Sequence, residues 1–274
     1  MLEEPRSGRL AAWGNALLSG RISPDGAMHH IVGDDALHRV VGLPGEDGRV
    51  GLTLALGRLR SLGATGLRVA LPVSGHPLGL SGPPEFNARA LAAEEAVIVC
   101  GGPGLGLGLV PDVSAVGPAG DEHVEVVWEC LPVREGPPAD VPTLGEAERE
   151  LAEAMREATA ALTRLDVAGA GPGARAALEA YQARMERGQQ VLAPGYPPRA
   201  ARVLELAQRV GALMAIAYGP EGSGTGGGPE HGGAVSAAEM GARRALLQPV
   251  ERTARRAQVA AYNAFVEEQE RERG

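Results

Sequence analysis

The chain changes character at a proline-rich joint, GPPADVP, at residues 136–142. Before the joint, short apolar runs alternate with glycine and proline, which is typical of strands joined by tight turns. After it, apolar residues recur every three or four positions, as they do along one face of a helix. The sequence therefore predicts an α+β protein. Residues 1–136 form a strand-containing region with a mixed or antiparallel sheet and short helices, and residues 137–274 form a helical, bundle-like region.

Four apolar runs in the first region predict strands, at residues 67–73, 95–100, 107–113 and 123–133. The last three are separated by connections of hairpin length that contain glycine or proline. Strands that follow one another so closely favour antiparallel pairing, because parallel strands need a longer crossover. Apolar spacing and end signals also predict three short helices, at residues 9–19, 23–33 and 53–63.

The second region opens with Thr143 and Glu146, the pattern T-x-x-E, in which each side chain binds a free backbone N–H at a helix start. Apolar residues then follow a heptad, which predicts that this helix packs against partner helices. The heptad consists of Leu144, Leu151, Ala158 and Leu165, with Met155 and Leu162 between them.

Three more helices are expected in the second region. One carries Leu178, Tyr181 and Met185, the next begins at Pro197, and the last begins at Ser236. Pro249 lacks a backbone N–H and predicts a kink or break in the last helix. Residues 219–233 are rich in glycine and predict a flexible loop between the last two helices.

Charge and composition exclude several classes of function. The net charge is −8 and all 26 basic residues are arginine, so the electrostatic field opposes binding to DNA or RNA. The uncharged stretch at 96–111 is interrupted by glycines and is too short to cross a membrane. The acidic opening segment does not resemble a signal peptide, so a cytoplasmic protein is expected. Cys100 and Cys130 lie in apolar runs and are expected to be buried free thiols.

The densest group of potential metal ligands is HHIVGDDALH, which spaces His30, Asp34 and His38 four residues apart. Imidazole and carboxylate suit a divalent transition metal such as Zn, Mn or Fe. Along an unbroken helix this spacing drifts by about 40° per step, so the three side chains share a site only if the chain bends at Gly33. Glycine followed by two aspartates is also typical of a helix end and a new cap. We favour this second interpretation and predict no cofactor.

A second candidate site is the loop PVSGHPLGLSGPPEFN, residues 72–87, which follows a predicted strand. Rigid loops at the end of a strand often carry binding residues. This loop offers an acid-base group and hydrogen-bonding side chains: His76, Ser81, Glu85 and Asn87. Prolines also form inert rigid turns, so a purely structural loop is the alternative.

No sequence motif commits the chain to one chemistry. The glycine-rich string at residues 100–108 is followed by prolines and valines where a nucleotide-binding helix would begin, so a hairpin is favoured. GxSxG, HExxH, P-loop and zinc-spaced cysteine motifs are absent.

In composition, and in the phrases LRVALPV and PPEFNARAL, the chain resembles conserved hypothetical proteins of high-GC bacteria. This resemblance implies no activity and no site residues.

Two functions of different classes follow. The first is a non-catalytic binding or assembly protein that self-associates, or binds a protein partner, through the helical region. The alternative is a small-molecule or metal-dependent enzyme, with its pocket between the 72–87 loop and the cluster of His30, Asp34 and His38.

Overall fold

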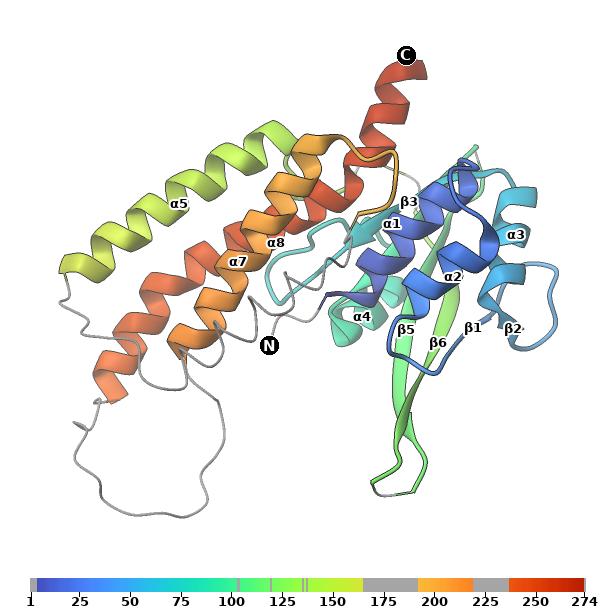
Figure 1. Cartoon of the computed structure of the whole chain (residues 1–274), viewed down its shortest axis with the longest axis horizontal. Helices are drawn as coiled ribbons and strands as arrows, with labels where there is room; N and C mark the ends of the chain where they lie inside the picture. The colour runs from blue at the N-terminus through green and yellow to red at the C-terminus, as the bar shows by residue number, and fades with distance from the viewer. Residues whose placement is uncertain are drawn as a thin grey trace.

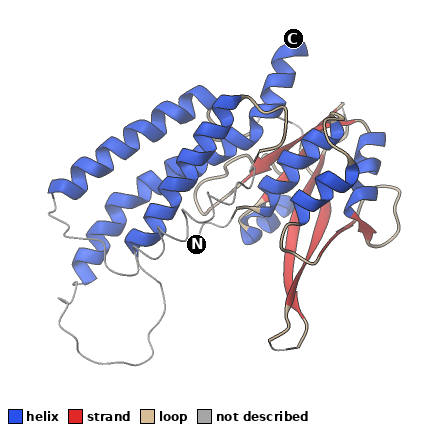
Figure 2. Ribbon diagram, in the orientation of Figure 1, coloured by secondary structure: helices blue, strands red, loops and turns tan. Residues whose placement is uncertain are grey.

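The structure is a computed structural model that describes residues 4–102, 104–118, 120–134, 136, 138–164, 192–218 and 237–273. A six-stranded sheet with short helices lies beside a group of long helices (Figure 1). This arrangement confirms the predicted α+β class and the bundle-like second region. Figure 2 shows that all strands belong to one side of the molecule and the long helices to the other.

The sheet has the order β2-β1-β6-β5-β4-β3 and is mixed. Only β1 and β6 run parallel, and the other neighbouring pairs are antiparallel. The strands are β1 (Leu37–Val41), β2 (Val50–Gly51), β3 (Ala64–Ala70), β4 (Ala96–Gly101), β5 (Leu107–Val116) and β6 (His123–Pro132). The glycine-rich string joins β4 to β5 as the predicted hairpin. The strands β1 and β2 were not predicted.

Four short helices accompany the sheet: α1 (Arg6–Leu18), α2 (Pro24–Val32), α3 (Leu52–Ser61) and α4 (Pro84–Ala93). Helices α1, α3 and α4 contact strands, and α2 packs on α1 and α3. Ser23 caps α2, since its hydroxyl accepts a hydrogen bond from Gly26 N, and Gly33 ends this helix with a positive φ of 58°. The interpretation of Asp34 and Asp35 as a new helix cap is wrong, because β1 follows them. The helix predicted at residues 53–63 was expected to be capped by Thr53, but α3 begins at Leu52 with Gly51 as its N-cap.

The helical half contains α5 (Leu144–Arg164), α7 (Pro198–Tyr218) and α8 (Ala237–Arg273). The capping box at the start of α5 is confirmed, with Glu146 Oε2 2.9 Å from Thr143 N and Thr143 Oγ1 3.3 Å from Glu146 N. Pro249 predicted a kink or a break in the last helix; the break is wrong, because α8 continues through Pro249 as one helix, and the kink stays a prediction. The expected helix around Tyr181 and the 219–233 loop lie outside the described residues.

One apolar core extends from the sheet into the helical half. Leu10 of α1, Leu67 of β3 and Leu151 of α5 are each fully buried in it, together with Tyr262 of α8. Four large aromatic residues are also buried: Trp13, Trp128, Phe86 and Phe265. Residues on both sides of the proline-rich joint share this core, and the division of the chain into regions 1–136 and 137–274 stays a prediction. None of the described helices has the length and apolarity to cross a membrane.

The outer edge of β3 is covered by side chains from two helices. Asn15 of α1 donates to Leu67 O (3.0 Å) and accepts from Leu67 N (2.7 Å). Two residues along the strand, Asn263 of α8 makes the same pair of bonds with Val69, at 3.1 Å to its O and 2.7 Å to its N. Arg255 Nε then donates to Leu71 O at 3.0 Å. These amides take the place of a seventh strand, because they satisfy backbone groups that an edge strand otherwise leaves open.

Candidate functional site

The three predicted metal ligands lie in different surroundings. His30, in α2, stacks on Trp13 with ring centroids 3.6 Å apart and 6° between the planes. Asp34 is exposed in the turn after α2, whereas His38 is buried in β1. Among the residues that the structure describes, no group of three His, Cys, Asp or Glu side chains lies close enough to hold a metal ion. The structure therefore does not bring His30, Asp34 and His38 together.

Asp35, which was not predicted as a site residue, is the centre of a buried charged cluster. Arg6 binds it with two hydrogen bonds, Nε to Oδ2 at 2.9 Å and Nη2 to Oδ1 at 2.8 Å. Arg9 Nη2 donates to Oδ2 at 2.6 Å, and His38 Nε2 lies 3.0 Å from the same oxygen. Burial acts to raise the pKa of Asp35, but the bonds from Arg6 and His38 and the charges of both arginines outweigh it and lower the pKa to about 2.

Both ring nitrogens of His38 are engaged. The indole N–H of Trp128 can only donate, and it lies 3.3 Å from His38 Nδ1, so Nδ1 accepts. Nε2 then carries the proton and donates to Asp35, which makes this histidine neutral. Burial lowers the pKa of His38, although the hydrogen bond and charge of Asp35 partly oppose that effect. A buried neutral imidazole with both nitrogens bonded inside the protein is a structural group rather than a proton carrier for a substrate.

The four predicted ligand-binding residues of the 72–87 loop face different partners. Ser81 Oγ donates to Arg134 O at 2.8 Å, and Asn87 Oδ1 accepts from Gly82 N at 3.0 Å. Glu85 is exposed in the first turn of α4. His76 Nδ1 lies 3.8 Å from Asp140 Oδ2. Ser81 and Asn87 thus hold the loop to neighbouring backbone, and the four side chains do not converge on one point.

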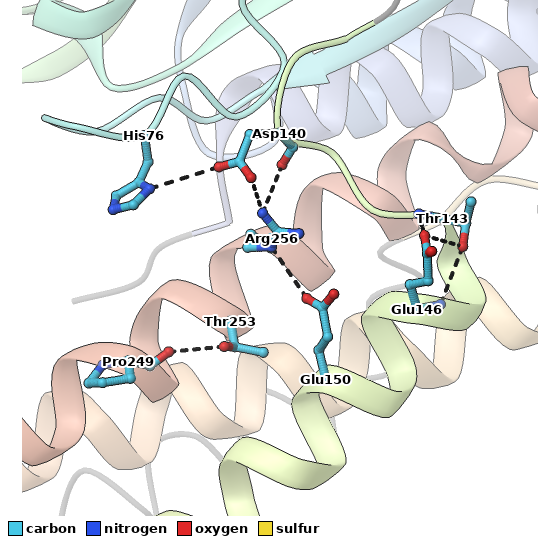
Figure 3. Close-up of polar contacts among 8 residues, drawn as sticks. All are labelled: His76, Asp140, Thr143, Glu146, Glu150, Pro249, Thr253 and Arg256. Atoms are coloured by element: carbon cyan, nitrogen blue, oxygen red, sulfur yellow. Dashed lines mark hydrogen bonds and ion pairs between the residues drawn. The ribbon is translucent and has the colours of Figure 1, made fainter.

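His76 belongs to a chain of charged residues that ties the loop to the helical half (Figure 3). Arg256 of α8 forms an ion pair with the Asp140 carboxylate through Nη1, which also donates to Asp140 O at 3.3 Å. Its Nε lies 3.3 Å from Glu150 Oε2 on α5. Asp140 adopts a positive φ of 56°, which turns its backbone oxygen and its carboxylate toward the same guanidinium. This network joins the loop, the proline-rich joint, α5 and α8.

Sequence reasoning missed the residues that organise these contacts. Asn15 and Asn263 lie in otherwise apolar helix segments, and a lone amide among buried apolar neighbours is a signal that it binds backbone. Arg6 and Arg9 lie three apart on one face of α1, which indicates a shared acidic partner. Nothing local to Asp35 identifies it as that partner, since it lies 29 residues from Arg6.

Comparison with known proteins assigns the chain to a family. Residues 7–143 match the family described as Rv1486c-like protein, N-terminal domain, and residues 145–259 match the corresponding C-terminal domain. The chain belongs to the Rv1486c-like family. The shared core contains residues of both matched segments, and at the edge of β3 Arg255 lies in the second segment whereas Asn263 lies beyond its end.

The relatives are mycobacterial proteins. The "Uncharacterized protein Rv1486c" of Mycobacterium tuberculosis (strain ATCC 25618 / H37Rv) is 32% identical over 77% of this chain and 82% of its own length. The "Uncharacterized protein ML1804" of Mycobacterium leprae (strain TN) is 29% identical over 94% of this chain and 96% of its own. The predicted resemblance to conserved hypothetical proteins is confirmed, and the names of these relatives state no activity. No solved structure matches the chain.

Proposed function

We propose that this Rv1486c-like protein is a non-catalytic, cytoplasmic binding protein that docks a protein partner on its projecting β-hairpin. The hairpin arm comprises residues 110–116 of β5 and 123–126 of β6; Val110 and Val126 at its base are buried, and the rest of the arm extends away from the helices (Figure 1). The observation that carries the proposal is the free edge of this arm. Within the described residues, β4 pairs only with positions 107–109 of β5, so the rest of β5 has a strand neighbour on one side alone.

Apolar side chains along that edge face solvent. Asp112 to Val116 are all exposed, and Val113 and Val116 have exposed fractions of 44% and 41%. An open strand edge with exposed apolar side chains is the surface to which an extended peptide adds as a further strand. Backbone hydrogen bonds supply affinity in that mode, and the side chains supply specificity.

Charge identifies the kind of partner. Residues 107–133 contain five acidic side chains and no arginine or lysine: Asp112, Asp121, Glu122, Glu125 and Glu129. An extended basic segment of another protein complements this arm, whereas a second copy of the arm brings like charges together. We therefore propose a basic protein segment as the occupant.

The helical half is the weaker docking candidate. The heptad leucines Leu144 and Leu151 are buried within the chain's own core, where α5 packs on α7 and α8. A partner or second copy on α5 would have to contact its charged outer face, where Arg149 and Glu153 are exposed. The polar residues expected at an enzyme pocket, such as His38, Ser81 and Asn87, bond within the fold, which supports a binding role over the enzyme alternative.

A site-specific photo-crosslinker tests the proposal. Placed at Val113 in cells, it is expected to capture a basic protein that the same group at Leu54 of α3, itself 55% exposed, does not. The captured protein, once purified, should bind the wild-type chain directly and bind a Val113→Ser/Val116→Ser variant about tenfold more weakly. Identical adducts from the two positions, or unchanged affinity of the variant, would show that the arm is not the docking surface.

A further inference from the structure

A cleft of about 170 Å³ lies between the turn that joins β4 to β5, the segment after β6, and the C-terminal part of α8. Its lining includes Arg68, Cys100, Arg134 and Glu270, together with the side-chain-free positions Gly102 and Gly136. Apolar cavities of about 150 Å³ hold molecules of the size of benzene, so this cleft has room for a small organic or inorganic ion. Leu105 and Val133 of its lining lie at the opposite end of β5 and β6 from the tip of the hairpin arm, so the cleft needs no part of the proposed docking surface.

Arg68 uses only half of its hydrogen-bonding fork. Its Nη2 donates to Glu270 Oε2 at 2.6 Å, whereas its Nε is buried and makes no hydrogen bond of ordinary geometry, although the guanidinium also interacts with the Cys100 thiol. A carboxylate or phosphate that bonds a guanidinium edge-on engages both of these nitrogens at once. The Arg68 side chain is 16% exposed, so the bare Nε lies where an unsatisfied donor is costly.

Glu270 is poorly held in comparison. Its side chain is 53% exposed and reaches Arg68 from near the end of α8 with a single oxygen. Exposed ion pairs of this kind contribute little, because solvent screens them and the side chain loses rotamer freedom. An incoming anion can therefore displace the Glu270 carboxylate without disturbing the sheet or the helix.

The other groups around Arg68 define what the cleft admits. Burial raises the pKa of the Cys100 thiol to about 11, although Arg68 opposes this, so the thiol stays protonated and does not add negative charge. Burial also raises the pKa of Glu267, which lies within the electrostatic field of Arg68. The exposed Arg134 guanidinium makes no ion pair with any described residue and supplies a second positive charge at the lining.

We propose that this cleft binds a small oxyanion, a carboxylate or a phosphate group, on the Nε and Nη2 edge of Arg68, and that Glu270 is its internal competitor. Arg68 then exchanges its single hydrogen bond to Glu270 for two hydrogen bonds to the anion, and its buried Nε gains a partner. The site is thus partly closed by the chain's own carboxylate until a ligand with better geometry replaces it.

Calorimetric titration of the full chain tests this site, at constant ionic strength maintained with sodium chloride. Inorganic phosphate and acetate are titrated separately, and saturable binding of either one supports the proposal and identifies which oxyanion is preferred. The Glu270→Gln variant should bind about two- to fivefold more tightly than the wild type, because the competing carboxylate is gone. Arg68→Lys keeps the charge but removes the planar fork, and should weaken binding about tenfold.

Glu268→Gln is the matched control. It removes the same charge from the same helix turn, but Glu268 pairs with Arg271 rather than with Arg68. If Glu268→Gln tightens binding as much as Glu270→Gln does, the effect is one of net charge and the proposal fails. It also fails if neither anion binds saturably to the wild type or to Glu270→Gln, or if Arg68→Lys binds as the wild type does.

Discussion

The amide of Asn263 is expected to be among the most stabilising polar groups of the fold, and Asn263→Leu tests this. The substitution keeps the side-chain volume nearly constant but removes both hydrogen bonds to Val69, at 2.7 and 3.1 Å. Val69 is 1% exposed, so water does not readily replace the lost partner. An unsatisfied buried N–H or C=O costs about 1 to 3 kcal/mol, and two of them predict a loss of about 2 to 6 kcal/mol in the free energy of unfolding.

Urea denaturation followed by circular dichroism measures this loss as a lower transition midpoint with an unchanged slope. Gln248→Leu is the control, because Gln248 is an exposed residue of the same helix and its replacement should change stability by less than about 0.5 kcal/mol. Asn263→Asp keeps the acceptor for Val69 N, but it buries a carboxylate and sets an oxygen against Val69 O, so it should be no less harmful than leucine at neutral pH. Equal stability of Asn263→Leu and the wild type would refute the view that the amide completes the sheet edge.

Three further predictions concern the core and the buried cluster. Leu151→Ala should lower the free energy of unfolding by about 2 to 5 kcal/mol, because Leu151 is fully buried, and urea denaturation measures this loss. The side chains of Leu162 and Leu213, which the apolar pattern of the helices also places in the core, lie outside the described residues. The pKa of His38 is lowered in the folded state, so stability should fall as pH decreases below about 6.5, where the unfolded chain takes up the proton, and should level off below the folded-state pKa. His38→Gln should have a shallower dependence of the free energy of unfolding on pH, and an identical slope would contradict this origin. Protein purified without an affinity tag should contain less than about one-tenth equivalent of any transition metal by elemental analysis, whereas about one equivalent that is lost in His30→Ala would restore the metal-dependent enzyme.

Capping residues and turn glycines predicted those helix ends and hairpins that depend only on neighbouring residues. The capping box of Thr143 and Glu146, the cap at Ser23 and the β4–β5 hairpin each depend on residues a few positions apart. Strand β1 was missed because it is a five-residue strand that pairs in parallel with β6, and its partner Glu125 lies far along the chain from Leu37. A parallel partner leaves no turn signal between the two strands.

The candidate site was harder to predict for a related reason. Ser81 and Asn87 were predicted to bind a ligand, and the structure shows each bonded to the chain's own backbone; a sequence does not distinguish these two kinds of bond. Residues 72–87 are held by Arg134, which follows β6, and by Asp140 of the proline-rich joint. Asp35 and Arg68 depend likewise on Arg6 and Glu270, which distant helices bring to them.

The covered edge of β3 has a consequence for biosynthesis. Asn263 follows Val69 by 194 positions, so the sheet is translated long before the helix that completes it. At about 5 to 20 residues per second, that interval lasts roughly 10 to 40 s. During it the growing chain presents Val69 and Leu71 as an open template for pairing with other nascent chains. Ribosome-bound intermediates that lack α8 should therefore depend on chaperones, and slowing translation within residues 70–250 should increase aggregation even though the finished protein is unchanged.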